Sequence, residues 1–301
     1  MRAGPKDKLS RACYWLACVG MRVHHLSCGS LCPRGRRLIN GDGGLLEDGV
    51  IVCHCLLIEA TDSLVLIETG FGTDDMRDPR QLGVAFNALM RPKQDAQQTA
   101  LRQIEALGFE ASDVRHIVLT HLDLDHAGGL PDFPAAQVHV FAPELEAALH
   151  PSLRERSRYI GGAHWTHNPR WATHSAGGEH WFGFESVRVI PEIDAEVLLV
   201  PLIGHSTGHS AVAVKSSNGW LLHCGDAYFH HRELESPPSC PQALRLFQSL
   251  VAADNSARKA NRERLRELIS AHSQEVSTFC AHDPAELERA QGSGQRSSVR
   301  G

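Results

Sequence analysis

Apolar and β-branched runs alternate with amphipathic stretches along most of the chain. The runs VIVCHCLLIEA (50–60) and SLVLIETG (63–70) predict two buried strands. Residues 95–108 have the apolar spacing of a helix and end at a glycine. Further strands are predicted at 184–190, 196–202, 210–216 and 219–227, and a long helical region at about 241–272. We therefore expect an α/β protein with a sheet-rich core and outer helices. The hairpin order of its strands argues against a simple doubly wound parallel sheet.

The same pattern places one domain at residues 21–290. Residues 1–20 lack it and are expected to form a flexible extension, unless the true start is Met21, which opens the first strand-like run. The Gly/Ser-rich stretch 291–301 is expected to be a disordered tail. Inside the domain, residues 151–182 break the rhythm because they gather tryptophans, histidines and glycines.

Composition narrows the classes of function. The 301 residues are 42% hydrophobic and 22% charged, with a formal net charge of −5, which is ordinary for a globular protein. This charge balance argues against a nucleic-acid partner, because proteins that bind nucleic acids usually have a basic face. We expect no membrane span, because no long uninterrupted apolar run is present. Nine cysteines form neither a C-x-x-C pair nor a disulfide framework, which favours a reducing, cytoplasmic location.

The stretch LIGHSTGHS (202–210) has two interpretations. It contains G-x-S-x-G, in which Ser206 would be the nucleophile of a serine hydrolase. That motif requires a helix after the serine, whereas the next residues alternate and then turn at Asn218-Gly219, which predicts a hairpin. In the second interpretation His205 is a metal ligand, in a chain with 19 histidines. The local context favours the metal ligand.

A second stretch, THLDLDHAGGL (120–130), gathers side chains that bind metals directly after a predicted strand. They are His121, Asp123, Asp125 and His126. Leu122 and Leu124 alternate with them, so we expect the polar side chains to share one side of an extended segment. An EF-hand loop does not fit, because no glutamate stands at its twelfth position. The pattern indicates a metal site at a strand end.

Taken together, these motifs resemble the metallo-β-lactamase superfamily. Its T-H-x-H-x-D-H-x-G-G is matched by residues 120–129 with Asp123 for the second histidine, its G-H-T-x-G-H by 204–209, its later aspartate by Asp226, its distal histidine by His282, and its D-T-G-x-G by 68–72. The match covers about residues 21–290 and looks closest to lactonase-like and glyoxalase-II-like hydrolases. It implies a four-layer αβ/βα sandwich of two mixed β-sheets flanked by helices.

The resemblance also implies a centre for two divalent metal ions, with zinc the first expectation. The first ion would be bound by His121, Asp123 and His205, the second by Asp125, His126 and His282, with Asp226 as the bridge and His209, Thr120 and Glu68 behind the ligands. Asp123 departs from the family and gives three carboxylates around the two ions, a bare charge of +4 − 3 = +1. A carboxylate weakens the preference for zinc over manganese or iron. The departure leaves open whether one or two ions bind.

The implied activity is hydrolysis of a small ester, lactone or similar bond by a metal-bound hydroxide, with Asp125 and Asp226 as catalytic residues. Trp165, Trp171 and Tyr228 are candidates for an apolar substrate wall, although the tryptophans could equally pack residues 151–182 onto the domain. Three alternatives stay open: a glyoxalase-II-like thioesterase, an iron-dependent redox or oxygen protein of the same fold, and a non-catalytic metal-binding module. We expect a small-molecule substrate and a monomer or homodimer.

Overall fold

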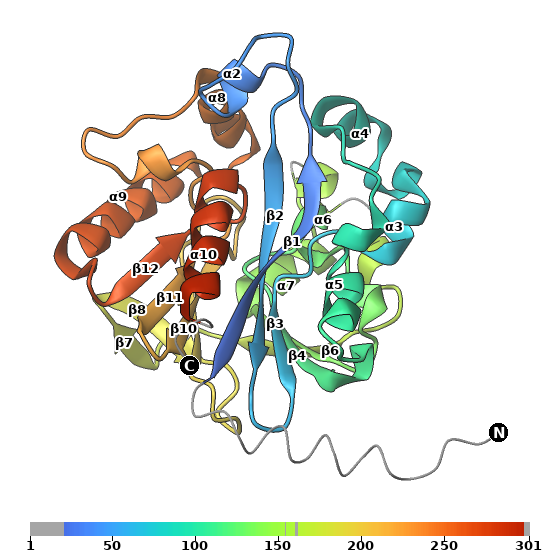
Figure 1. Ribbon diagram of the computed structural model, residues 1–301, viewed down its shortest axis with the longest axis vertical. Coiled ribbons are helices and arrows are strands. Elements are labelled where there is room, and N and C mark those ends of the chain that lie inside the picture. Colours follow the sequence, from blue (N-terminus) through green and yellow to red (C-terminus); the bar gives the residue numbers. More distant parts are fainter. Residues whose placement is uncertain (1–20, 154, 160–161, 298–301) are drawn as a thin grey trace.

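Two six-stranded β-sheets form the centre of the molecule, with α3, α4 and α5 on one side and α8, α9 and α10 on the other (Figure 1). The computed structural model describes residues 21–153, 155–159 and 162–297. The first sheet contains β1 (Arg22–Leu31), β2 (Ile51–Glu59), β3 (Leu64–Ile67), β4 (Val114–Val118), β5 (Gln137–Phe141) and β6 (Arg170–His174). The second contains β12 (Val276–Phe279), β11 (Gly219–His223), β10 (Ser210–Ser216), β9 (Val197–Pro201), β8 (Phe184–Arg188) and β7 (Glu179–Trp181). The helices are α2 (Arg36–Ile39), α3 (Thr73–Arg77), α4 (Val84–Met90), α5 (Ala100–Ala106), α6 (Leu124–Ala127), α7 (Ala142–Leu149), α8 (Gln242–Val251), α9 (Asn255–His272) and α10 (Pro284–Ser297).

Both sheets are mixed, as the sequence predicts. In the first sheet β1, β2 and β3 pair antiparallel, and β3 to β6 pair parallel. In the second sheet β11 and β12 pair parallel, and the other neighbours pair antiparallel. The predicted α/β class with two mixed sheets is therefore confirmed.

Alternation along the strands produces the layers. On β3, Leu64 and Leu66 pack with Ile104 of α5 in a cluster on the helix side of the first sheet. Val65 and Ile67 point the other way and pack in a cluster shared with strands of the second sheet. The same alternation lets α9 cover the outer face of the second sheet. The order is therefore helix, sheet, sheet, helix, the predicted four-layer sandwich.

The hairpin predicted after Ser206 is present. Strands β10 and β11 pair antiparallel with Ser216 opposite Gly219, so the chain turns through two residues. A strand, and not a helix, therefore follows the G-x-S-x-G stretch, which removes the structural setting of a serine nucleophile.

Two local expectations are corrected. The segment after β4 is not extended throughout, because the helix α6 begins directly after Asp123. The helical region at 241–272 is two helices, and the side chain of Asp254 caps the second by accepting from the backbone N–H groups of Ser256 and Ala257. Helix α10 extends to residue 297, inside the stretch 291–301 for which the sequence predicts a disordered tail. The side chain of Gln291 donates to the backbone carbonyl of His25 in β1, which holds this end of the helix. The predicted extension at 1–20 lies outside the described residues, as do 298–301.

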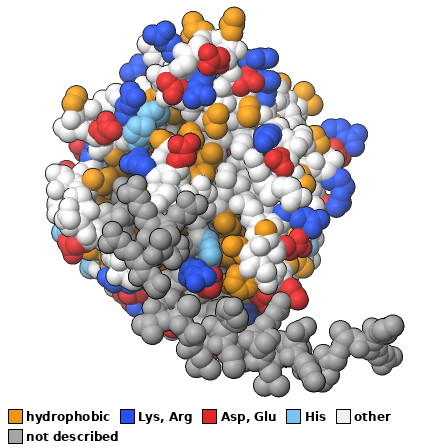
Figure 2. Space-filling model, viewed as in Figure 1, with side chains coloured by type: hydrophobic (Ala, Val, Ile, Leu, Met, Phe, Trp, Pro, Cys, Tyr) orange, Lys and Arg blue, Asp and Glu red, His pale blue; other side chains and the backbone are white. Residues whose placement is uncertain are grey.

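The visible surface is mixed in character. Acidic and basic side chains are interspersed over the face in Figure 2, with single hydrophobic side chains between them. None of the helices in the described ranges is long and apolar enough to cross a membrane.

Candidate metal centre

The candidate metal-binding side chains predicted from the sequence meet at one place, where strands of both sheets end. His121, Asp123, Asp125 and His126 follow β4, His205 follows β9, Asp226 follows β11 and His282 follows β12. They form two groups, within each of which the candidate ligand atoms lie no more than 4.8 Å apart. Four separate loops are thus brought together by the packing of two sheets.

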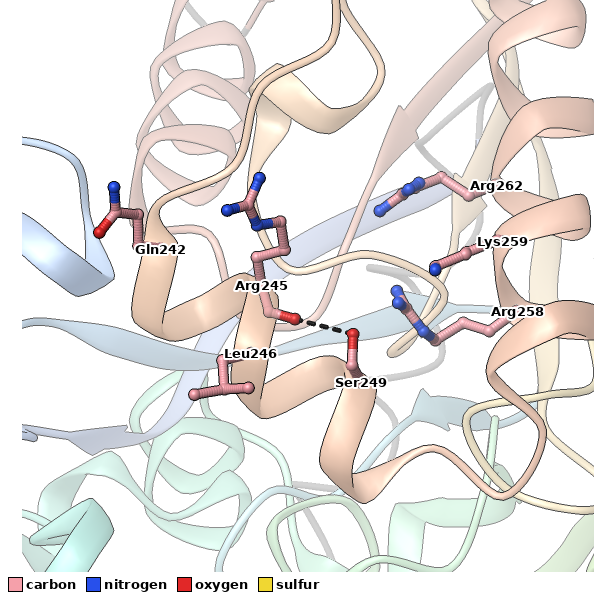
Figure 3. A pocket seen from close by; sticks show the side chains of 7 residues that line it. All are labelled: Gln242, Arg245, Leu246, Ser249, Arg258, Lys259 and Arg262. Carbon is pink, nitrogen blue, oxygen red and sulfur yellow. Dashed lines mark hydrogen bonds between the residues drawn. The ribbon is translucent and has the colours of Figure 1, made fainter.

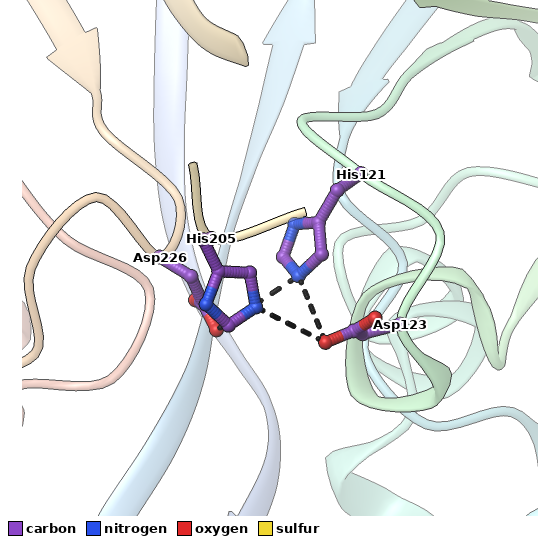
Figure 4. Close-up of side chains that lie close together, drawn as sticks. All are labelled: His121, Asp123, His205 and Asp226. Atoms are coloured by element: carbon purple, nitrogen blue, oxygen red, sulfur yellow. Dashed lines mark hydrogen bonds and ion pairs between the residues drawn. The ribbon is translucent and has the colours of Figure 1, made fainter. Parts of the chain in front are cut away.

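The first cluster consists of His121, Asp123, His205 and Asp226, whose polar ends converge in Figure 4. The Oδ2 atom of Asp123 lies 3.4 Å from Nε2 of His121 and 3.1 Å from Nε2 of His205. The Oδ2 atom of Asp226 lies 3.8 Å and 3.3 Å from the same two nitrogens. Two imidazoles and two carboxylates therefore face a common point.

The second cluster consists of Asp125, His126 and His282, and it reaches the other oxygen of Asp226. That atom, Oδ1, lies 3.3 Å from Nε2 of His126 and 3.0 Å from Nε2 of His282. The carboxylate of Asp125 lies 4.0 Å from His126 and 3.7 Å from His282. Asp226 thus turns one oxygen to each cluster, which is the arrangement expected of a bridging ligand.

The donor atoms fit divalent metal ions. Nitrogen of imidazole and oxygen of carboxylate are ligands of zinc, and both also suit manganese and iron. Four buried atoms in the clusters have no hydrogen-bond partner of good geometry: Nε2 of His121, Oδ1 of Asp123, Nδ1 of His205 and Oδ1 of Asp226. Buried polar atoms are normally satisfied, so this group of unpartnered atoms indicates a place for a cation.

Three further residues set the orientation of the ligands, as the family resemblance implies. Glu68 accepts from Nδ1–H of His126 at 2.6 Å and from the backbone N–H of Thr120 at 2.5 Å. This leaves Nε2 of His126 directed at the cluster. The hydroxyl of Thr120 is 2.9 Å from Nδ1 of His121. His209 donates from Nδ1 to the carbonyl of Leu202 and accepts at Nε2 from the backbone N–H of Asp226. Such partners fix both the tautomer and the ring plane of a ligand.

The charges of the centre favour a bound cation. Burial alone would raise the pKa of Asp226, but the neighbouring His282 and His126 hold it well below its usual range. Burial alone would lower the pKa of His126, but Asp226 and Glu68 raise it well above its usual range. The ionised carboxylates are therefore stabilised by positive charge nearby. When the imidazoles are neutral, a divalent ion would supply that charge.

Two residues of the centre were missed by sequence reasoning. Glu144 of α7 accepts at Oε2 from the hydroxyl of Ser206 at 2.6 Å and the N–H of Gly208 at 2.9 Å, and at Oε1 from the N–H of Leu122 at 3.0 Å. It therefore ties the two ligand loops together, and burial raises its pKa. Ser206 is fully buried and donates to this carboxylate, so it is a structural residue.

The second missed residue is Arg158, whose guanidinium reaches the first cluster. Its Nη1 lies 2.5 Å from Oδ2 of Asp123 and 2.8 Å from Nε2 of His205. Burial alone would raise the pKa of Asp123, but Arg158 and His121 hold it well below its usual range. The only signal in the sequence was a basic run, RERSR, inside the unassigned stretch 151–182.

The expected substrate residues do not gather at the centre. Trp165 and Trp171 pack against the core on the helix side of the first sheet, which agrees with their packing interpretation. Tyr228 is fully buried in the core of the second sheet, and its hydroxyl donates to the carboxylate of Glu286. Tyr228 therefore contributes no apolar wall at the centre, because its ring turns to the core of the second sheet.

Two hollows formed by the described residues lie elsewhere. One of about 570 Å³ lies between α8 and α9 and is lined by Gln242, Arg245, Leu246, Ser249, Arg258, Lys259 and Arg262 (Figure 3). Another of about 800 Å³ lies beside α4. Neither contains a residue of the two clusters, so neither forms the immediate surroundings of the metal centre.

Comparison with known proteins identifies the family. The model of the metallo-beta-lactamase superfamily matches residues 48–271, and the chain belongs to this superfamily. A probable metallo-hydrolase of Mycobacterium tuberculosis is 43% identical over 265 residues, 88% of this chain and 81% of that protein. An N-acyl homoserine lactonase of Rhizobium radiobacter is 26% identical over 268 residues, 88% of this chain and 94% of that protein.

Solved structures share the fold. A mutant lactonase of B. thuringiensis with N-decanoyl-L-homoserine at its active site has a TM-score of 0.65 and 20% identity, covering 89% of this chain and 95% of that one. A dizinc quorum-quenching lactonase has a TM-score of 0.59 and 15% identity, covering 88% of each chain. The predicted superfamily and its fold are thereby confirmed, and with them the coarse class of metallo-hydrolase.

Proposed function

We propose that this chain is a metal-dependent hydrolase that cleaves an ester or lactone bond in a small molecule. The observation that carries the proposal is the carboxylate of Asp226, which turns one oxygen to each of two ligand clusters. The lactonases among the similar proteins support a lactone or related ester as substrate.

The two clusters, Asp226 and Asp125 would each have a different role in this reaction. Ions held by the two clusters would supply Lewis acidity and would lower the pKa of a water molecule. Zinc is the first expectation, and manganese and iron compete with it because Asp123 is a harder ligand than histidine. Asp226 fixes the separation of the two clusters. Asp125, whose side chain is 13% exposed, is the carboxylate from which a proton could pass to a leaving group.

The test is a substrate panel on protein of measured metal content. The panel contains N-acyl homoserine lactones, simple lactones, aryl esters, a glutathione thioester and a phosphoester, and the metal content is measured by mass spectrometry. Hydrolysis of lactones or esters that chelation abolishes and divalent metal restores would support the proposal. Preferred cleavage of the thioester would replace it with a glyoxalase-II-like activity. Bound metal without turnover of any member would leave a non-catalytic binding module.

A matched pair of variants ties the activity to the centre. Asp226→Asn keeps the shape but removes the charge shared by the clusters. We expect its kcat/KM to fall by at least roughly 100-fold, since even partners behind metal ligands are typically worth 10- to 100-fold. The exposed Asp62→Asn is the control and should behave as wild type. Full activity in Asp226→Asn would refute the shared carboxylate.

A further inference from the structure

The first cluster contains a cation that belongs to the chain itself. Nη1 of Arg158 lies 2.5 Å from Oδ2 of Asp123 and 2.8 Å from Nε2 of His205. Asp123 and His205 are two of the four residues of that cluster. A guanidinium can only donate, so Nε2 of His205 must accept, and its lone pair is directed at Arg158.

These are the atoms that a first metal ion would use. A metal bonds to the in-plane lone pair of an imidazole nitrogen and to a carboxylate oxygen at about 2.0–2.2 Å. The lone pair on Nε2 of His205 can serve the guanidinium or the ion, and it cannot serve both. The arginine therefore competes with an ion for the first cluster.

Arg158 is held in place by groups that take no part in metal binding. Its Nη2 donates to the backbone carbonyls of His205 at 3.0 Å and Val251 at 2.5 Å. Its side chain is only 9% exposed, and a guanidinium stays charged at every pH at which proteins fold. The positive charge is consequently held beside the first cluster.

The segment around Arg158 is anchored on both sides of the arginine. The carboxylate of Glu155 accepts from the hydroxyl of Thr207 at 2.6 Å. The hydroxyl of Tyr159 donates to Glu144 at 3.0 Å. Both partners lie on or beside the loop that carries His205, so the arginine is positioned by the same loop that supplies the ligand.

The second cluster has no such competitor. In the ranges that the structure describes, no arginine or lysine forms an ion pair with Asp125, His126 or His282. Nδ1–H of His282 donates to the carbonyl of Val52 at 2.8 Å, and Nδ1–H of His126 donates to Glu68. Both Nε2 atoms are thus presented to Asp226 and to an ion.

We propose that Arg158 takes the place of an ion in the first cluster, so that the chain binds one divalent ion tightly at the second cluster and a second ion only weakly. Like charges repel, and a fixed cation at contact distance from two ligands makes the first cluster the poorer site. The inference rests on the proposed function only for the existence of the metal centre.

The test is a metal titration that does not depend on activity. Protein freed of metal by chelation is dialysed against a series of Co²⁺ concentrations, and bound cobalt is measured by mass spectrometry and absorption spectroscopy. We expect wild type to bind its two ions with affinities at least about tenfold apart, because one site faces a neighbouring unit charge. In Arg158→Met, which keeps the length and loses the charge, the weaker ion should bind at least about tenfold more tightly.

Four variants control the titration. Arg156→Met changes an exposed arginine of the same segment and should match wild type. Arg158→Lys keeps a cation and should leave the second ion weak. His282→Gln should abolish the tight binding, and His121→Gln should leave it intact. Equal affinities of the two ions in wild type would overturn the inference, even if Arg158→Met failed to fold. An Arg158→Lys variant that binds the second ion as tightly as Arg158→Met would also overturn it.

The outcomes separate this inference from the proposed function. Unequal binding without hydrolysis of any ester or lactone would remove the proposed function and leave the role of Arg158 standing. Hydrolysis by a protein that binds two ions equally would do the reverse.

Discussion

At the scale of single residues, Glu68 has a strained backbone beside the centre. It follows β3 with a φ of 63°, a left-handed backbone that residues other than glycine adopt only at a cost of about 1–3 kcal/mol. That conformation turns its carboxylate toward both Thr120 and His126. The hydrogen bonds of this carboxylate to Thr120 and His126 hold the strained conformation, and the second of them orients a candidate ligand of the second cluster.

Glu68→Gln should weaken metal binding while preserving the fold. The amide has the same shape, but an NH₂ group facing Nδ1 of His126 would force that nitrogen to accept, and the ring proton would move to Nε2, where a metal must bind. We expect the affinity for the tight ion to fall about 10- to 100-fold, as for other partners of ligating histidines. Cobalt titration measures it, with Glu196→Gln, at a side chain that is 35% exposed, as the control. An unchanged affinity would mean that Glu68 has only a structural role.

The candidate ligands and the residues behind them could be predicted from the sequence, whereas Arg158 and Glu144 could not. His121, Asp123 and His126 lie in one short motif whose spacing indicates a metal site without any knowledge of the fold. Arg158 contacts Asp123 across 35 positions, and Glu144 contacts Ser206 across 62. No local pattern marks such partners, because only tertiary packing brings them together.

At the scale of secondary-structure elements, three neighbouring parallel strands each contribute one histidine to a hydrogen-bonded row. His116 of β4 and His174 of β6 each lie 3.0 Å from His139 of β5, one at each of its ring nitrogens. Burial and then the two neighbouring histidines lower the pKa of His139 to about 3. The row is therefore neutral in the folded protein at neutral pH.

This row should make the fold sensitive to acid. Between pH 6.5 and about 3 the unfolded chain binds more protons at His139 than the folded one, so the free energy of unfolding falls as the pH drops. His139→Gln removes the site and should retain about 1–2 kcal/mol more of its neutral-pH stability at pH 4.5 than wild type does. Urea unfolding from pH 7.5 to 4.5 measures the difference. The exposed His150→Gln is the control, and a variant whose loss parallels wild type would contradict the expectation.

Element boundaries were less predictable than element types. Apolar alternation identified the buried strands, but the start of α6 after Asp123 depends on how the ligand loop closes against neighbouring loops. Likewise, the polar composition of residues 291–297 gave no sign of a helix that the β1 backbone holds at Gln291. In both places tertiary contacts outweigh local sequence preference.

At the scale of the whole molecule, the metal centre joins the two sheets. The ligands after β4 extend from the first sheet, and those after β9, β11 and β12 extend from the second. The sandwich is held together elsewhere by the apolar cluster between its sheets, to which β3, β9 and β10 contribute. An ion bound at the centre would therefore link the two layers at the end where the loops converge.

Metal binding should consequently stabilise the entire fold. A ligand that binds only the folded state at one hundred times its Kd adds about 2.7 kcal/mol to the free energy of unfolding. We expect the Tm of metal-free wild type to rise stepwise with added Zn²⁺, first with the tight ion and again at higher concentration with the weaker one. Asp226→Asn, which lacks the charge shared by both clusters, should show a smaller rise, and Asp62→Asn the full rise. Thermal unfolding followed by circular dichroism across a zinc series measures these Tm values. A wild-type Tm that does not change with zinc would mean that the clusters bind no ion in the folded protein.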